Sequence, residues 1–145
     1  MPNPMRKLLF ISVVCALATG ALLPGAAPAG TSTWNSQANK VCVVWLAKAK
    51  KEFATPVKAA GLYKFAVNAK KLEAQELVQL QSIPGPSAAG THALSVMGAD
   101  VAEVGSAISA YDRGDSAGFI RILKVYLNDH RTKAAFTAAG AAQCG

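Results

Sequence analysis

The chain has 145 residues, enough for one domain and too few for two domains of ordinary size. Its hydrophobic content of 52% excludes wholesale disorder, and 12 Gly with 7 Pro are too few for a collagen-like or low-complexity chain. Fifteen Lys and Arg against eight Asp and Glu give a net charge of +7. These numbers limit the fold class and leave the function open.

The first 29 residues have the pattern of a secretory signal peptide. Arg6 and Lys7 precede an apolar run that ends at Leu23 and is followed by small residues, with no acidic residue in the segment. The tripeptide Ala27-Pro28-Ala29 is a candidate cleavage site. We therefore predict a secreted protein with a helical signal peptide over residues 1–29 and one domain over residues 30–145.

There are two alternatives to cleavage. An uncleaved leader would anchor the chain in a membrane, although its apolar run of 16 residues is short of the ~20 that span a bilayer. Lipidation at Cys15 is disfavoured, because Val14 stands where a lipobox has Gly, Ala or Ser. Cleavage would remove two of the 15 basic residues and none of the eight acidic ones, so the mature net charge would be +5.

The mature chain would keep two of the three cysteines, Cys42 and Cys144. Exported domains use cysteines mainly in disulfides, and two cysteines allow a single pairing. We predict a Cys42–Cys144 bond, with two free buried thiols as the alternative. Closing a loop of about 100 residues would contribute roughly 4 to 5 kcal/mol through chain entropy.

Helix-forming residues dominate after Gly30, and no stretch alternates convincingly with the period of a strand. A first helix is predicted over 36–53, with these residues on its buried face: Cys42, Trp45, Leu46, Ala49 and Phe53. Thr55-Pro56 would end or bend it. A second helix is predicted over 57–81, weakened near its start by Gly61. Its inner side would hold Leu62, Phe65, Ala69, Leu72, Leu77 and Leu80, and its outer side Lys64, Lys71 and Gln75.

The segment Ile83–Ser87 contains two prolines and a glycine and predicts a turn before the third helix. Apolar residues of the third helix recur at spacings of three and four, as in a bundle seam: Leu94, Met97, Val101, Val104, Ile108 and Tyr111. We expect Gly114 to cap its end and Asp115 to cap the start of a fourth helix that runs to Gly140. The inner face of that fourth helix would hold Phe119, Ile122, Leu123, Tyr126, Leu127, His130 and Ala134.

Four helices with short connections predict an all-α fold, a four-helix up-down bundle with one disulfide. In that topology the first helix begins at the end of the bundle where the fourth helix finishes. Cys42 and Cys144 then meet, so helix order and cysteine counting lead independently to the same pairing.

The search for catalytic constellations yields no convincing set. HExxH, Cys/His pairs for zinc, GxxxxGK and GxGxxG do not occur. We also identify no GxSxG elbow that would match either histidine to a serine nucleophile. The carboxylate pairs Glu73/Glu76 and Asp112/Asp115 are interpreted as solvated helix positions and caps, and a glycosidase role is not expected. We therefore predict that the chain is not an enzyme and that it has no metal site and no cofactor.

His130 is unusual because it falls on the predicted inner face of the fourth helix. A histidine at the edge of the core is the simpler interpretation. The alternative is a ligand for haem or another apolar molecule inside the bundle, together with Tyr126, Tyr111 or Met97, although no CxxCH motif is present. Tyr111 and Met97 are more often core residues in such a seam.

Eight lysines and one acid, Glu52, lie between Lys40 and Lys71, which gives this half a local charge near +7. Such a field attracts an anionic envelope polymer or lipid surface, with strong salt dependence. Nucleic acid is not expected, because the segment has no arginine and no interleaved exposed aromatics. A merely solubilising surface is the alternative. The basic surface is predicted to include Lys48, Lys50, Lys51, Lys58, Lys64, Lys70 and Lys71.

Several short segments occur in a recognisable order: the leader, Trp34-Asn35, Cys42, LQSIPGP over 80–86, Gly114-Asp115 and the closing AAGAAQCG. In these the chain resembles a family of small uncharacterised secreted or envelope helical proteins of actinobacteria with a pair of cysteines. The resemblance covers almost all of the mature chain. It implies an exported bundle with paired cysteines and supplies no reaction. Members often have a lipobox, which this chain lacks.

We therefore expect a secreted or cell-envelope helical protein that acts by binding and not by catalysis. The alternative function is an extracellular carrier of haem or another apolar ligand. The sequence leaves the identity of the partner and the oligomeric state open.

Overall fold

The computed structural model of the chain describes residues 29–54 and 58–144, with side chains from Trp34 onward. The predicted signal peptide and its cleavage site lie outside the described residues, except for Ala29. The predicted helix break at Thr55-Pro56 lies outside them as well.

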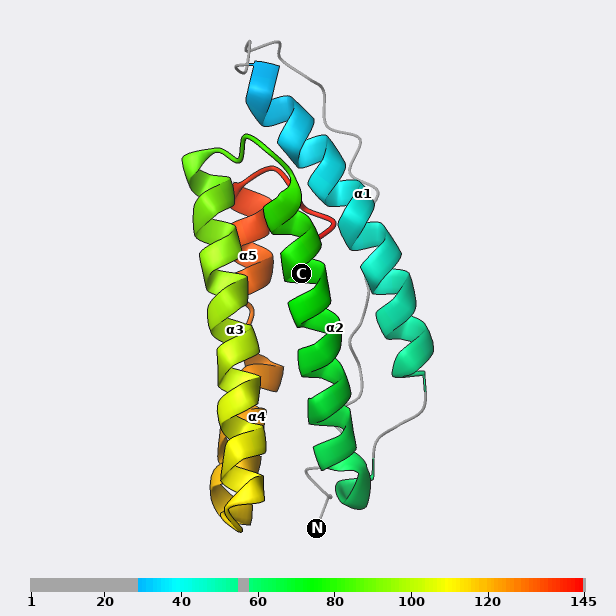
Figure 1. Ribbon diagram of the computed structural model, residues 1–145, viewed down its shortest axis with the longest axis vertical. Helices are drawn as coiled ribbons and strands as arrows, with labels where there is room; N and C mark the ends of the chain where they lie inside the picture. Colours follow the sequence, from blue (N-terminus) through cyan, green and yellow to red (C-terminus); the bar gives the residue numbers. More distant parts are fainter. Residues whose placement is uncertain (1–28, 55–57, 145) are drawn as a thin grey trace, which may run out of the picture.

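The described residues form helices and no strand: α1 (Ala29–Glu52), the short 3-10 helix η2 (Ala59–Gly61), α2 (Leu62–Ser82), α3 (Ala88–Asp112), α4 (Ser116–Asn128) and α5 (Arg131–Ala138). Successive long helices run in opposite directions, and α4 and α5 together make the fourth leg (Figure 1). The central helix α3 packs against α2, α4 and α5, whereas α1 packs against α2. The predicted all-α, up-down bundle is confirmed.

The first helix begins at Ala29, seven residues before the predicted start at Ser36. Residues 30–35 contain Gly, Thr, Ser and Asn, which are weak helix formers, so the sequence favoured a later start. Packing overrides this preference, because Trp34 is fully buried. Its ring lies against Gly90 of α3, where an added Cβ would come within 3.1 Å of the indole.

Side-chain caps define the ends of the middle helices. Ser87 Oγ accepts a hydrogen bond of 3.1 Å from Gly90 N at the start of α3. Gly114 takes a φ of +80° after α3, and Asp115 Oδ1 accepts a hydrogen bond of 2.8 Å from Gly118 N at the start of α4. The two predicted caps at Gly114 and Asp115 are confirmed. Helix α2 begins one residue after Gly61, later than the predicted start at Val57.

The predicted fourth helix is broken at Asp129 and His130, which is a correction to the sequence analysis. Asn128 Nδ2 donates to Lys124 O, and Asp129 Oδ1 accepts a hydrogen bond of 2.8 Å from Arg131 N. Short polar side chains that bond to nearby backbone compete with the helical hydrogen bonds. The Asn128-Asp129 pair therefore ends α4, and α5 begins at Arg131.

This break changes which residues face the core. His130 and Ala134 were predicted to lie on the inner face but are exposed, and Ala135 and Phe136 are buried in their place. Three other predicted inner residues are at least partly in solvent: Leu46 at 39%, Tyr111 at 45% and Leu127 at 36% exposure. The remaining predicted inner positions are buried or half-buried.

The core consists of two apolar clusters, one at each end of the bundle. The cluster near the start of α1 contains Trp34, Cys42, Leu80, Met97, Phe136 and Cys144 among its buried residues. The cluster near the α3–α4 turn contains Ala66, Val104, Ala107, Ala110, Phe119 and Leu123. Among the described helices, α3 alone has the length and composition of a membrane span, and it contributes to both clusters as the central helix of the bundle.

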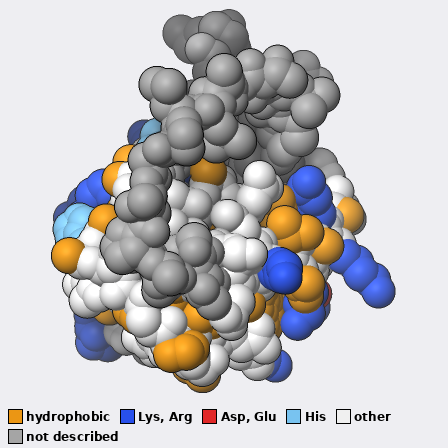
Figure 2. Space-filling view, turned by 90° about the horizontal axis from the view of Figure 1, so that it is seen from above, with side chains coloured by type: hydrophobic (Ala, Val, Ile, Leu, Met, Phe, Trp, Pro, Cys, Tyr) orange, Lys and Arg blue, Asp and Glu red, His pale blue; other side chains and the backbone are white. Residues whose placement is uncertain are grey.

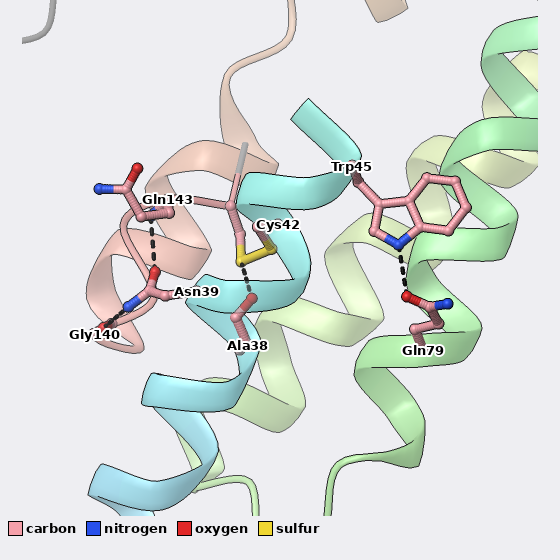
Figure 3. Close-up of a disulfide and its surroundings, with 8 residues drawn as sticks. Ala38, Asn39, Cys42, Trp45, Gln79, Gly140 and Gln143 are labelled. Carbon is pink, nitrogen blue, oxygen red and sulfur yellow. Dashed lines mark hydrogen bonds between the residues drawn. A yellow bond between two sulfur atoms is a disulfide. The ribbon is translucent and has the colours of Figure 1, made fainter. Parts of the chain in front are cut away.

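The disulfide joins Cys42 of α1 to Cys144 in the segment after α5, across 102 positions of sequence (Figure 3). Their Cα atoms lie 5.0 Å apart, within the range usual for disulfides. Asn39 reinforces the connection, because its Oδ1 accepts a hydrogen bond of 3.0 Å from Gln143 N. The predicted pairing is therefore confirmed, and the alternative of two free thiols is wrong.

We expect loss of the disulfide to lower the free energy of unfolding by about 4 to 5 kcal/mol, because the unfolded chain regains the freedom of a loop of about 100 residues. Urea unfolding of the protein with and without a thiol reductant measures this difference. The C42A/C144A variant is the control, since reductant should leave its midpoint unchanged. A wild-type midpoint that does not move on reduction would contradict the prediction.

Candidate functional site: a lysine surface and a buried carboxylate layer

The basic segment forms an exposed surface, defined here as the lysine surface: Lys40, Lys48, Lys50, Lys51, Lys58, Lys64, Lys70 and Lys71. All eight side chains are exposed, including the seven predicted to form a basic surface. Within residues 29–54 and 58–144 every ion pair involves Arg131, so no lysine there is paired with a carboxylate. The positive charge of this surface is therefore open to solvent and to a partner.

Two of these lysines are positioned by contacts. Lys48 Nζ lies 3.7 Å from the ring centroid of Trp45, whose indole nitrogen donates a 2.8 Å hydrogen bond to Gln79 of α2. Lys70 lies close to Gly105 of α3, with Nζ 3.2 Å from the place of an added Cβ. It lines an open depression of about 500 Å³ together with Ala102, Gly105, Ser106, Ser109, Arg113 and Ile122.

Five carboxylates form a second feature, defined here as the carboxylate layer: Glu73, Glu76, Asp100, Glu103 and Asp129. Along α2 the two glutamates lie between residues of one apolar cluster and residues of the other. On α3 the same holds for Asp100, which lies between Met97 and Val104. Asp129 reaches this level because the chain breaks between α4 and α5. The layer thus separates the two halves of the core.

Glu73 and Glu76 are largely buried, which raises the pKa of each to about 7. The Tyr126 hydroxyl donates a hydrogen bond to Glu73 Oε1, which partly offsets that rise for Glu73. Burial, reinforced by the charge of Glu73, also raises the pKa of Tyr126 well above its ordinary value. Each of these two glutamates can therefore gain or lose a proton near neutral pH.

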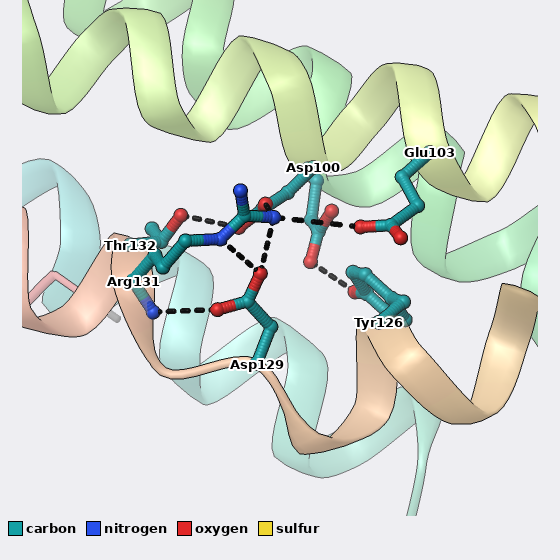
Figure 4. Close-up of polar contacts among 7 residues, drawn as sticks. Asp100, Glu103, Tyr126, Asp129, Arg131 and Thr132 are labelled. Carbon is teal, nitrogen blue, oxygen red and sulfur yellow. Dashed lines mark hydrogen bonds and ion pairs between the residues drawn. The ribbon is translucent and has the colours of Figure 1, made fainter.

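Arg131 supplies positive charge to the other side of the layer. Its Nη2 lies 3.6 Å from Asp100 Oδ1 and 3.6 Å from Glu103 Oε2, and its guanidinium also bonds to Asp129 (Figure 4). The hydrogen bonds from Arg131 hold the pKa of Asp129 below its usual range. Thr132 Oγ1 donates to Asp100 Oδ2. Asp100 Oδ1 is buried and has no hydrogen-bond partner among the described residues.

Oxygen atoms of Asp100, Glu103 and Asp129 lie within 4.8 Å of one another. Carboxylate oxygens in such a group suit a hard divalent cation. In this structure the guanidinium of Arg131 lies among the same oxygens and provides the positive charge that a cation would supply. The guanidinium of Arg131 therefore balances part of the negative charge of the carboxylate layer.

The sequence analysis was wrong about Glu73 and Glu76, which it interpreted as solvated helix positions. Burial of these two acids is easily missed in a helix that also exposes seven other polar residues. The signal that was available is their position opposite Lys64, Lys71 and Gln75, on the same side as Ala69 and Leu80. Asp112 is exposed and accepts a hydrogen bond of 2.9 Å from Tyr63.

A serine signature also went unrecognised in the sequence. Residues 114–118, GDSAG, have the GxSxG spacing of a nucleophile elbow, which places its serine on a turn between a strand and a helix. Here the five residues form the turn between two helices, α3 and α4. Asp115 and Gly118 make the N-cap, and Ser116 is exposed on the first turn of α4. The spacing is explained by helix capping.

The four residues considered as ligands of haem or another apolar molecule have different surroundings. Met97 is buried in the cluster near the disulfide, and Tyr126 bonds to Glu73 in the carboxylate layer. Tyr111 stacks on Tyr63 with ring centroids 4.4 Å apart, near the opposite end of the bundle. His130 is exposed between α4 and α5. The described contacts do not bring these side chains together around one cavity.

No protein-family model matches the chain, and neither a curated protein nor a solved structure matches it.

The buried glutamates predict that the protein loses stability as the pH rises through about 7. The folded chain keeps protons on Glu73 and Glu76 between about pH 4.5 and 7, whereas the unfolded chain releases them. Stability is therefore highest at the acidic end of this window and falls by about 1.4 kcal/mol for each unit of pKa difference. Urea midpoints measured from pH 5 to pH 8 test this.

Replacing Glu73 with Gln keeps the shape and removes one titrating group, so E73Q should show a smaller fall in stability over that range. The matched control is E52Q, which removes an exposed carboxylate of α1 and should behave like the wild-type protein. Equal pH dependence in wild type and E73Q would contradict the role assigned to the layer.

Proposed function

We propose that the protein is exported and binds an anionic component of the cell envelope, a polymer or a lipid surface, through the lysine surface. It acts as a binding protein in this proposal and not as an enzyme. The observation that carries the proposal is that eight exposed lysines have no ion-pair partner among the described residues.

The distribution of charge over α2 supports this proposal. The helix directs Glu73 and Glu76 toward the interior and Lys64, Lys70 and Lys71 toward solvent. Its acids therefore do not neutralise its lysines at the surface, where the field that attracts a partner acts. A purely solubilising surface has no need of this separation, since interspersed charges of both signs also keep a protein soluble.

The disulfide supports the exported part of the proposal, because disulfides persist in oxidising compartments and are rare in the cytosol. The basic and apolar leader, which lies outside the described residues, agrees with this compartment.

We predict that the oxidised protein beginning at Gly30 binds vesicles that contain phosphatidylglycerol and also binds immobilised dextran sulfate. Binding to both should weaken strongly as salt rises from 0.05 to about 0.5 M, because these charges are exposed to screening. The K51Q/K64Q/K71Q variant should bind about 100-fold more weakly at low salt. Sedimentation with the vesicles and retention on the resin measure the two affinities.

The variant R121Q/K124Q/K133Q is the matched control, since it removes the same number of charges from exposed positions on α4 and α5. It should retain most of the binding. Equal losses of affinity in the two triple variants would show that binding depends on net charge and not on the lysine surface. Absence of binding by the wild-type protein would overturn the proposal.

Export is tested separately. Material recovered from outside the producing cell should begin at Gly30 by N-terminal sequencing and should contain no free thiol. An intact leader on all of the recovered protein would contradict cleavage at Ala29.

A further inference from the structure

We propose that the outer face of α1 lies on an anionic lipid bilayer, with valine side chains inserted at the level of the headgroups. This inference rests on the proposed function and narrows its partner from any anionic envelope component to a lipid surface. The outer face of α1 is defined by residues spaced three, four, seven and eleven positions along the helix: Lys40, Val43, Val44, Ala47 and Lys51.

The opposite face of α1 packs against the protein core. Trp34, Ala38, Cys42 and Trp45 are all less than 5% exposed. Val43 and Val44, in contrast, are 51% and 54% exposed, and both are bordered by lysines. The helix therefore has two apolar faces, one buried against the bundle and one in solvent among positive charges.

Exposed valines distinguish a lipid surface from a polar polymer. A polyanion offers charge to the lysines but no apolar medium in which a valine side chain could leave water. A bilayer offers both, because an amphipathic helix can lie in its interface with apolar residues near the acyl chains. Lysine side chains beside those residues can extend their charged ends toward the phosphates.

The neighbouring helix α2 continues the pattern next to α1. Its outer positions hold Lys64, Val67, Lys71 and Val78, with the valines 37% and 65% exposed. Viewed down the bundle, the side on which α1 lies shows lysine or arginine side chains interleaved with hydrophobic ones (Figure 2). Charge and apolar area thus occur together on both adjacent helices.

The outer face of α1 is also held in place before any partner binds. The disulfide fixes the helix at Cys42, and the hydrogen bond from Trp45 to Gln79 fixes it to α2 one turn later. Further along, Phe53 packs on Phe65 with ring centroids 4.9 Å apart. A face held in this way loses little conformational freedom on binding.

Helix α4 provides a comparison within the same molecule. It exposes Ile120 at 47% and Val125 at 53% next to Arg121 and Lys124, so its apolar exposure is like that of α1. Its part of the chain, residues 113–133, holds five basic and two acidic residues, against eight and one over residues 40–71, so its local positive charge is lower. The proposal therefore predicts that apolar substitutions on α1 weaken binding to lipid, whereas equivalent substitutions on α4 do not.

The experiment uses the oxidised protein from Gly30 onward, since the core, the disulfide and the described helices lie within residues 29–144. V43S/V44S and I120S/V125S are compared with wild type by sedimentation with phosphatidylcholine vesicles that contain phosphatidylglycerol, and by retention on dextran sulfate. Circular dichroism and the urea midpoint confirm that both variants are folded.

We expect V43S/V44S to bind the anionic vesicles about ten-fold more weakly than wild type and to bind dextran sulfate unchanged. I120S/V125S should match wild type on both. An unchanged vesicle affinity for V43S/V44S, or a loss confined to I120S/V125S, would overturn the lipid assignment while leaving salt-dependent binding to polyanions intact. If the wild-type protein binds neither the vesicles nor dextran sulfate, the proposed function itself is overturned.

Discussion

The covalent bond between Cys42 and Cys144 is the constraint on which the rest of the structure depends. Helix α1 packs against α2, and the bond with its neighbouring Asn39 contacts ties it to the segment that follows α5. Because one face of α1 is fixed in this way, its opposite face has a defined orientation. The proposed binding surface is therefore a consequence of how the two ends of the domain are joined.

The carboxylate layer shows that the interior is not uniformly apolar. Two hydrophobic clusters lie at the ends of the bundle, and acids from α2, α3 and the α4–α5 connection lie between them. Arg131 forms ion pairs with acids of this layer, and Tyr126 donates a hydrogen bond to Glu73. Protonation of the two glutamates lowers the remaining free-energy cost of their burial. Because these acids are buried, they do not neutralise the exposed lysines of α2. The arrangement of the core therefore contributes to the positive charge of the surface.

Periodicity and cysteine counting were sufficient to predict the helical class, the order of the long helices and the disulfide. They failed where short-range or tertiary contacts compete with periodicity. Asn128 and Asp129 end α4 through bonds to nearby backbone, and Trp34 extends α1 through packing that local propensity does not encode. The lysine surface was predictable because charge is read directly from sequence. The spacing along α2 indicates which side Glu73 and Glu76 occupy, but their position beside Asp100, Glu103 and Asp129 depends on how α2, α3 and the α4–α5 connection are placed relative to one another.

Gly140 has a consequence for the position of the disulfide. Glycine adopts its φ of +79° without steric cost. A Cβ added at this position would lie 2.6 Å from Asn35 Nδ2 of α1. This close turn brings the last described residues back to the first helix, where Cys144 bonds to Cys42. The position of Cys144 beside Cys42 thus depends on a backbone conformation at residue 140 that side chains with a Cβ rarely adopt.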